Sequence, residues 1–348
     1  MSAVNRLLAG GVYPAHPLAL TEDLRLDEAG QRGLTRYYLA AGASGLAVGV
    51  HTTQFELHTE RSDLLRVVLA SAAEEAREHD RVSSGPTTVL IAGVLGETTR
   101  AVAEAELARE LGYDAVLLIP AASSSEDAEL ERARLVGAVL PVVGFYLQPS
   151  VGGRRLSPAF WTRLADQEST VAVKCAPFDR YETVAMIRAI SRSARCRDVA
   201  LFTGNDDNIL ADLVTQFPSA RTDEPPLSFA GGMLGQWAVW TARAVEHLAL
   251  AKRARGGDAL ARAEVDLLAH DLTDANAAVF DVANQFSGSI AGVHEVLRRM
   301  GLMRGTWCLN PRERLSPGQS ELLDSVWMDY PHLRDDEFVA DNREAWLS

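Results

Sequence analysis

The sequence predicts a closed (β/α)8 barrel, or TIM barrel, over residues 1–255, followed by a helical region over residues 256–348 that packs on the barrel. Short apolar runs alternate with amphipathic stretches eight times within about 250 residues, which is the pattern of consecutive parallel βα units. No G-x-G-x-x-G or G-x-x-x-x-G-K-[ST] motif follows a predicted strand, so an open nucleotide-binding sheet has little support. The chain after residue 255 shows helical patterns without strands.

Each predicted strand is a short apolar run, and Gly, Asp or Pro commonly marks its junction with the next helix. In the strand over 170–176, Thr170, Val171 and Val173 are β-branched, which favours extended backbone. The strands are predicted, in order, at 10–18, 45–50, 87–93, 114–120, 141–149, 170–176, 198–204 and 225–233. The helices that follow them are predicted at 26–42, 62–80, 99–112, 125–140, 157–167, 180–191, 206–217 and 235–254. The C-terminal helices are predicted at 259–286, 289–301 and 316–331.

Composition narrows the class of protein. The chain has 348 residues, of which 47% are hydrophobic, enough for a large core. Its net charge of −13 makes it a poor partner for nucleic acid or anionic lipid, which both require concentrated Lys and Arg. Three cysteines without metal-ligand spacing suit a reducing compartment, and no apolar stretch approaches the length of a membrane span. We therefore expect a cytoplasmic protein that binds neither nucleic acid nor membrane.

The fold predicts where chemistry takes place. Active sites of such barrels lie at the carboxyl ends of the strands. The polar residues expected there are Tyr13, His16, His51, Thr52, Thr53, Glu97, Tyr146, Gln148, Lys174, Asn205, Asp206 and Asp207. Their spacing forms no zincin-like motif and the carboxylates are few, so we expect neither a metal nor another cofactor.

Lys174 is the most informative of these residues. It lies near the end of a strand that is predicted to be buried on both faces, where an unpaired charge is costly. Apolar surroundings lower the pKa of an ammonium group, and only the neutral amine attacks a carbonyl. The iminium formed with a keto group is an electron sink that permits bond cleavage beside the former carbonyl carbon. The sequence therefore predicts Lys174 as a Schiff-base nucleophile, unless Asp179 in the following loop pairs with it.

Schiff-base chemistry also needs a proton carrier and an anchor for the substrate carboxylate. The phenol of Tyr146, on the neighbouring predicted strand, could carry the proton. Hydroxyl and backbone N–H groups of the segment His51, Thr52 and Thr53 could hold the carboxylate.

At these positions the sequence resembles the dihydrodipicolinate synthase / N-acetylneuraminate lyase family of class I aldolases, and the resemblance covers nearly the whole chain. It is carried by "GVYPAHPL", "GLAVGVHTTQFELHTE", "VGFYLQPSVGGRRLSP", "VAVKCA", "LFTGNDDNIL" and "VLRRMGLMRGTW". The resemblance implies a Schiff base at Lys174, proton transfer by Tyr146 and binding of a 2-oxo acid near residues 51–53. It also implies substrate contacts at Gly204 and Asn205.

The sequence departs from that family in three places. The family's second-strand GTTGE motif is altered, and its threonine pair corresponds either to His51 and Thr52 or to Thr52 and Thr53. The segment "IPAASSSEDAE" lacks the tyrosine-rich stretch of the synthases. Val151 stands where synthases usually carry an arginine. We therefore expect a lyase, aldolase or dehydratase acting on another 2-oxo acid, and not dihydrodipicolinate synthase itself; the alternative is an inactive barrel that binds a metabolite or a partner protein.

Several of these residues also have purely structural interpretations. His16 and His51 are expected to line the pocket, and Asp206 and Asp207 to cap the next helix. Cys175, adjacent to Lys174 in a strand, should point toward the helices.

Assembly is also implied by the resemblance. It implies a homo-oligomer, either a dimer or a tetramer built as a pair of dimers. The aromatic residues Trp237 and Trp240 are expected in the core or in such an interface.

Overall fold

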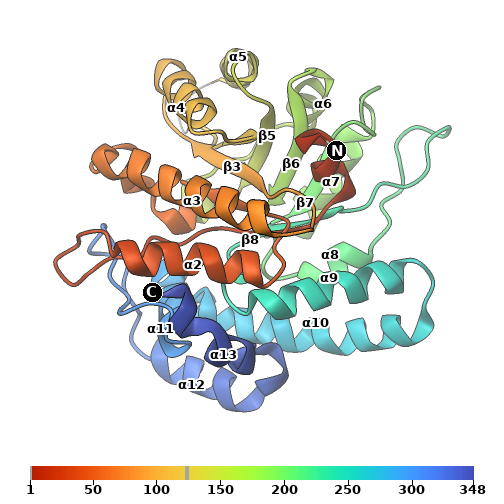
Figure 1. The fold of residues 1–348 in the computed structure, drawn as a ribbon. Coiled ribbons are helices and arrows are strands. Elements are labelled where there is room, and N and C mark those ends of the chain that lie inside the picture. Colours follow the sequence, from red (N-terminus) through yellow and green to blue (C-terminus); the bar gives the residue numbers. More distant parts are fainter. Residues whose placement is uncertain (1, 122–124) are drawn as a thin grey trace.

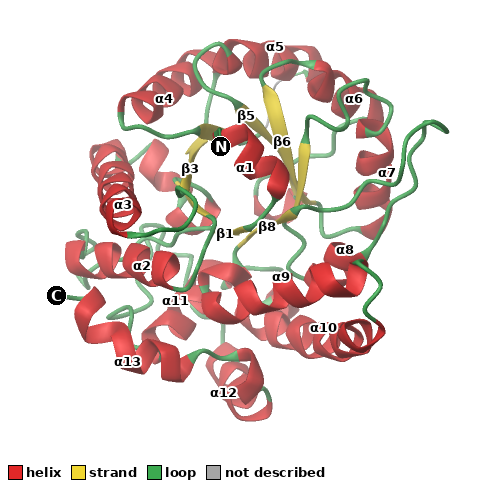
Figure 2. Cartoon of the chain, turned by 45° about the vertical axis from the view of Figure 1, so that its right-hand side comes forward, coloured by secondary structure: helices red, strands yellow, loops and turns green. Residues whose placement is uncertain are grey.

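The computed structural model describes residues 2–121 and 125–348. Eight parallel strands form one sheet in the order β1-β8-β7-β6-β5-β4-β3-β2. An isolated bridge between Ala15 and Ala47 joins the two outer strands, so the sheet curls into a nearly closed barrel. Figure 2 shows the ring of helices around these strands. The predicted (β/α)8 fold is confirmed.

The strands occupy the predicted segments but are shorter. They are β1 (Val12–Pro14), β2 (Gly45–Val48), β3 (Val89–Val94), β4 (Ala115–Leu118), β5 (Val142–Leu147), β6 (Thr170–Ala176), β7 (Ala200–Thr203) and β8 (Gly231–Leu234). The eighth strand begins at Gly231, after the predicted 225, because Leu227 forms an antiparallel bridge with Phe217 before the chain enters the barrel. Every strand residue is buried, as expected where helices cover the outside of a parallel sheet.

The helices that follow the strands enclose the barrel (Figure 1). They are α2 (Glu28–Ala40), α3 (Ser62–Val82), α4 (Thr98–Glu110), α5 (Glu126–Gly137), α6 (Pro158–Asp166), α7 (Arg180–Ile190), α8 (Ile209–Val214) and α9 (Thr241–Arg255). Besides α13 (Asp336–Trp346) in the C-terminal region, one helix was not predicted, α1 (Ala3–Ala9). Its residue Leu7 packs with Tyr13, Phe202 and other interior side chains of the barrel, so α1 closes the end of the barrel opposite the carboxyl ends of the strands.

The C-terminal region is helical and packs against α2, α8 and α9. It contains α10 (Ala259–Val279), α11 (Ser289–Arg299), α12 (Gln319–Asp329) and α13 (Asp336–Trp346), which Figure 1 shows gathered on one side of the barrel. Its apolar residues form one continuous core with the layer between strands and helices. Trp237 and Trp240 are both fully buried in this core, so neither belongs to an exposed interface.

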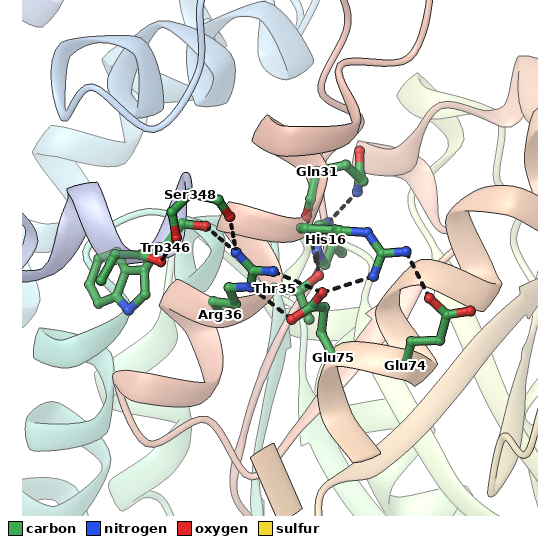
Figure 3. A network of polar contacts seen from close by, with 10 residues as sticks. His16, Gln31, Thr35, Arg36, Glu74, Glu75, Trp346 and Ser348 are labelled. Atoms are coloured by element: carbon green, nitrogen blue, oxygen red, sulfur yellow. Dashed lines mark hydrogen bonds and ion pairs between the residues drawn. The ribbon is translucent and has the colours of Figure 1, made fainter. Parts of the chain in front are cut away.

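A polar network fixes α2 between α3 and the C-terminal tail (Figure 3). The Arg36 guanidinium donates to Glu75 and to the backbone carbonyls of Trp346 and Ser348. On the inner side of α2, His16 lies 2.9 Å from Thr35 Oγ1. His16 was expected to line the pocket, but it is fully buried in this network and serves packing. No helix in the described part of the chain is long and apolar enough to span a membrane.

Candidate active site

A small cavity lies at the carboxyl ends of the strands and has a volume of about 70 Å³. This volume exceeds the minimum of about 10–15 Å³ that a single water molecule requires, so the cavity can admit a small ligand group. Its walls come from the ends of β5 and β6, from the loops after β1, β2, β7 and β8, and from the C-terminal segment 280–289. Barrel and C-terminal region therefore build the cavity together.

Lys174 projects into this cavity from β6. Side chains alternate along a strand, and its neighbours Ala172 and Ala176 belong to the interior cluster of the barrel. The register pairs Lys174 with Phe145 of β5, and Nζ lies 4.4 Å from the centre of the Phe145 ring. Gly204 makes room for the lysine, because a Cβ at that position would lie 2.7 Å from Lys174 Cε. The alkyl chain is thus held among apolar groups, with the amine directed into the cavity.

The amine of Lys174 makes no hydrogen bond or ion pair with residues 2–121 or 125–348. Burial lowers the pKa of Lys174 from 10.5 to about 8, although the negative charge of Asp206 opposes this shift. Burial likewise raises the pKa of Asp206 to about 7, while its hydrogen bond from the Gln236 N–H and the charge of Lys174 act against the rise. Burial thus disfavours the charged form of both groups, and their opposite charges partly offset this effect.

Asp179 was the expected rival partner for Lys174, and the structure gives it another function. Its carboxylate accepts hydrogen bonds from the backbone N–H groups of Tyr181 and Glu182, at 2.8 and 3.2 Å, and so caps α7. Asp206, in turn, was expected to cap the helix after β7. It does not: Oδ1 accepts from the Gln236 N–H at 2.9 Å, and the N-cap position of α8 is Asn208.

Tyr146 does not join Lys174 in the cavity. In β5 the interior positions are Val143, Phe145 and Leu147, so the side chain of Tyr146 points outward into the helix layer. Its ring stacks on Trp161 at 5.1 Å, and its hydroxyl donates to Glu182 Oε2 at 2.8 Å. Burial raises the pKa of the phenol above its usual value, and the hydrogen bond to Glu182 adds to this rise. The expected proximity of amine and phenol is contradicted by this register.

The segment His51–Thr53 forms a 3-10 helix whose members differ in position. His51 and Thr52 line the cavity, whereas Thr53 lies behind it. The Thr52 hydroxyl donates to Ala15 O at 2.7 Å and the Thr53 hydroxyl to His16 O at 2.6 Å. Both hydroxyl protons are thereby committed to the loop after β1. Burial lowers the pKa of His51 to about 4, and the nearby positive charge of Lys174 adds to this effect, so the imidazole is neutral.

Of Gly204 and Asn205, the two substrate contacts that the resemblance implies after β7, only Gly204 lines the cavity. The Asn205 amide donates to Asp212 Oδ2 at 3.0 Å and to Thr183 Oγ1 at 3.2 Å, and its oxygen accepts from Phe178 N. Asn205 therefore connects the loops after β6 and β7 and does not reach the cavity. Cys175 is buried against the helix layer, on the face opposite Lys174.

Sequence patterns did not indicate that the C-terminal region forms part of the cavity wall. Phe280, Phe286 and Ser289 line the cavity although they are separated from Lys174 by more than a hundred positions along the chain. Phe145 and Asp206 also line it. Of these five residues, only Asp206 could be recognised from the sequence, as a polar residue that follows a predicted strand. In the part of the chain that the structure describes, no group of three or more His, Cys, Asp or Glu residues is arranged to hold a metal ion.

The fold and the cavity define a (β/α)8 barrel with a buried lysine at the carboxyl end of its sixth strand. The model of the dihydrodipicolinate synthetase family matches residues 9–216, well over half of the chain, and the chain belongs to this family. The family is one of class I aldolase-type lyases. A curated relative is 4-hydroxy-tetrahydrodipicolinate synthase of Moorella thermoacetica, 28% identical over 206 residues. That match covers 57% of this chain and 64% of the relative, somewhat less than two thirds of its length.

Solved structures share the fold over most of their length. Dihydrodipicolinate synthase of Oceanobacillus iheyensis is 16% identical with a TM-score of 0.73, covering 95% of this chain and 100% of that one. N-acetylneuraminate lyase of Fusobacterium nucleatum is 20% identical with a TM-score of 0.68, covering 93% and 99%. At these identities the likeness concerns the fold.

Proposed function

We propose that this protein is a Schiff-base-forming lyase, aldolase or dehydratase that acts on a small 2-oxo acid through Lys174. The observation that carries the proposal is the amine of Lys174, which faces a small cavity at the strand ends without a hydrogen bond or ion pair from the described residues. A purely structural buried lysine requires a partner, because an unpaired buried ammonium is costly. A nucleophile requires the opposite, an amine that loses its proton near neutral pH.

The substrate carboxylate would lie against the segment after β2. Both threonine hydroxyls there already donate to backbone carbonyls, so they retain only acceptor capacity toward a ligand. The remaining donors are the backbone N–H groups of His51 and Thr52, which begin the 3-10 helix and have no carbonyl partner within it. The cavity volume of about 70 Å³ suits the three-carbon keto-acid end of a substrate.

The proton carrier in this proposal is Asp206 and not Tyr146. Asp206 shares the cavity with Lys174, and one of its oxygens is fixed by the Gln236 N–H. The second oxygen is then available to take a proton from a substrate hydroxyl and return it. A carboxyl group with a pKa of about 7 can do both at neutral pH.

We expect no condensation of pyruvate with aspartate semialdehyde, the reaction of dihydrodipicolinate synthase. Val151 lines the cavity where a cationic residue would be needed to bind the second carboxylate. The strand-four departure from the synthases involves residues 122–124, which lie outside the described residues. Robust dihydrodipicolinate formation in a coupled assay would contradict this expectation.

The position of Tyr146 favours a second candidate, a barrel that binds a keto acid at Lys174 without converting it. Such a protein would form the imine but would lack a group to move the proton. Exchange of the C3 protons of pyruvate with deuterium in D2O separates the two candidates, since only an enzyme with a working proton carrier accelerates it.

The test of the proposed function is reductive trapping. Borohydride added with a panel of 2-oxo acids should attach the reduced acid at Lys174, as read by intact mass and peptide mapping. Lys174→Ala and the charge-retaining Lys174→Arg should both lose the adduct while keeping the thermal denaturation midpoint of a folded protein. Full turnover by Lys174→Ala would exclude the Schiff-base mechanism.

A further inference from the structure

The polar and apolar side chains of the cavity occupy different parts of its wall. The groups suited to bind a keto acid are Lys174, Asp206 and the segment 51–52. Apart from Gln148 after β5, the remaining large side chains that line the cavity are apolar: Phe145, Leu147, Val151, Phe178, Phe280 and Phe286. A substrate whose carboxylate and keto group face the first set must place the rest of its structure against the second.

Exposure separates the floor of the cavity from its mouth. Phe145 and Leu147 are 3% and 4% exposed and belong to the barrel interior, so they form the floor. Val151, Phe178 and Phe286 are only partly buried, so they form the mouth. The rings of Phe178 and Phe286 meet edge to face with centres 5.6 Å apart. The mouth is therefore framed by an aliphatic side chain after β5, an aromatic ring after β6 and another from the C-terminal region.

The charges of the cavity wall also indicate an apolar group on the substrate. Among the described residues that line the cavity, Lys174 is the single cation and Asp206 the single anion. A second carboxylate on the substrate would lose its hydration beside three apolar side chains, with no cation at the mouth to compensate. A polyhydroxylated chain would find only the Gln148 amide as a large polar side chain in that part of the wall, and most of its hydroxyl groups would have no partner there. An aryl or branched alkyl group would instead exchange water for apolar contacts.

We propose that the substrate is a 2-oxo acid that carries an aryl or branched alkyl group at C4, on the side away from the carboxylate. This inference rests on the proposed function, because it uses Lys174 as the atom that holds the keto carbon. It extends that function by assigning the chemical class of the remainder of the substrate.

For a 4-hydroxy-2-oxo acid the reaction balances without an external oxidant or reductant. The amine of Lys174 condenses with the C2 carbonyl and water leaves. The C3–C4 bond breaks, its electron pair enters the iminium to give an enamine, and the C4 hydroxyl proton passes to Asp206. An aldehyde that carries the apolar group departs. Asp206 returns the proton to C3, and water releases pyruvate from the lysine.

Imine trapping tests substrate class without requiring turnover. Two acids of matched chain length are compared, 2-oxo-4-phenylbutanoate with an apolar end and 2-oxoglutarate with an acidic end. Each acid is added to the full chain over a series of concentrations, the imine is reduced with borohydride, and the adduct at Lys174 is quantified. We expect half-maximal labelling by the phenyl compound at roughly ten- to hundredfold lower concentration, the range that burial of one such group supplies.

Variants at Val151 test the role of the mouth. Val151→Arg introduces a cation there and should lower the half-saturating concentration of 2-oxoglutarate at least about tenfold while weakening the phenyl compound. Val151→Leu is the matched control and should retain the phenyl preference. Equal labelling by the two acids, a preference for 2-oxoglutarate, or trapping of pyruvate alone would overturn the inference. Failure to trap pyruvate as well would instead remove the proposed function on which it rests.

Discussion

Lys174 and Asp206 form the one pair of ionisable groups of opposite charge in the cavity, within the described residues, and each influences the proton affinity of the other. Because imine formation requires the neutral amine, the rate of trapping with pyruvate should rise with pH and level off above about 8, the pKa of Lys174. The check is a rate profile between pH 6 and 10. A flat profile would contradict a titrating nucleophile.

Asp206→Asn gives the same pair a second test. The negative charge of Asp206 favours the protonated lysine, so its removal should move the trapping profile to lower pH. The asparagine oxygen can still accept from the Gln236 N–H, so the loop after β7 should keep its conformation. Proton exchange at C3 of pyruvate should fall by roughly two to four orders of magnitude, because an amide cannot carry the proton. Trapping that persists with exchange lost would identify Asp206 as the carrier, whereas normal exchange would exclude it.

Tyr146→Phe should behave differently from what the resemblance alone implies. The resemblance predicts a loss of two to four orders of magnitude in turnover, the effect of a missing acid–base group. Since the phenol donates to Glu182 in the helix layer, we expect less than about a tenfold change in turnover and a loss of about 1 kcal/mol in the free energy of unfolding. Steady-state kinetics and urea denaturation measure the two effects. A hundredfold loss of turnover at unchanged stability would return Tyr146 to the mechanism.

The sequence predicted the position of some candidate residues near the strand ends for physical reasons that can be stated. Lys174 lies near the end of a buried strand, and His51, Thr52 and Gly204 follow buried strands; all four line the cavity. The predicted position of the Tyr146 side chain was wrong. Every residue of β5 is buried, so no alternation of polar and apolar residues shows which side chains face the barrel interior. In addition, the pairing of β5 with β6 shifts register between Val142 and Val143, so the facing residues of the two strands cannot be found by simple counting.

At the scale of elements, the segment 280–289 closes the cavity and is held by the C-terminal helices. Asp281, Gln285 and Phe286 all have φ between 55° and 67°, a left-handed conformation that is unfavourable for residues other than glycine. Asp281 is 1% exposed and accepts from the Gly288 N–H at 2.9 Å and from the hydroxyl of Ser316. The Gln319 amide, at the start of α12, donates to three backbone carbonyls, those of Ala278, Val279 and Gly288. Contacts with α12 thus hold the segment in this conformation.

Asp281→Ala should release this segment. The change leaves the buried Gly288 N–H and the Ser316 hydroxyl without their acceptor, which costs about 1–3 kcal/mol in the free energy of unfolding. Hydrogen exchange over 280–289 should accelerate, and the pyruvate concentration for half-maximal trapping should rise as Phe280, Phe286 and Ser289 lose their positions. Exchange mass spectrometry and trapping provide the readouts.

The control is Gln285→Gly, at an exposed position with φ 56°. Glycine adopts this conformation without steric cost, so the variant should keep or raise the thermal midpoint and leave trapping unchanged. Unaltered trapping in Asp281→Ala despite faster exchange would show that the segment does not shape the cavity.

At the same scale, sequence patterns predicted strands and helices well because turn residues mark the junctions in both the barrel and the C-terminal region. They could not indicate that 280–289 lies over the strand ends. That contact joins residues far apart in the chain, and nothing in a single sequence reports such a distance. The hydroxyls of Thr52 and Thr53 present the same difficulty, since their acceptors belong to the loop after β1.

At the scale of the whole molecule, the barrel and the C-terminal helices depend on each other. They share one apolar core, and the network around Arg36 fixes α2 to the C-terminal tail (Figure 3). Phe280, Phe286 and Ser289 complete the cavity from the same region. The helical region therefore contributes both to stability and to the candidate active site.

The assembly of the protein remains a prediction. We expect a dimer or tetramer at micromolar concentration, but not through Trp237 and Trp240, which lie in the core of one chain. Apolar side chains that the fold leaves exposed include Tyr181 and Val184, three positions apart on one face of α7 and 89% and 44% exposed. Light scattering of the unmodified protein should give a mass of at least two chains. A monomer would contradict the prediction.

The surface on α7 can then be tested directly. If it forms a contact between copies, Tyr181→Glu should reduce the scattering mass, because a carboxylate buried in an apolar interface without a partner is unfavourable. Leu260→Glu on α10 is the matched control, since Leu260 is 83% exposed on a different helix. Tyr181 lies on the solvent side of α7 and its backbone N–H, not its ring, contacts the Asp179 cap, so the substitution should leave the fold and the trapping at Lys174 intact. Loss of mass in the control variant alone would move the interface to α10, and an unchanged oligomer in both variants would exclude both helices.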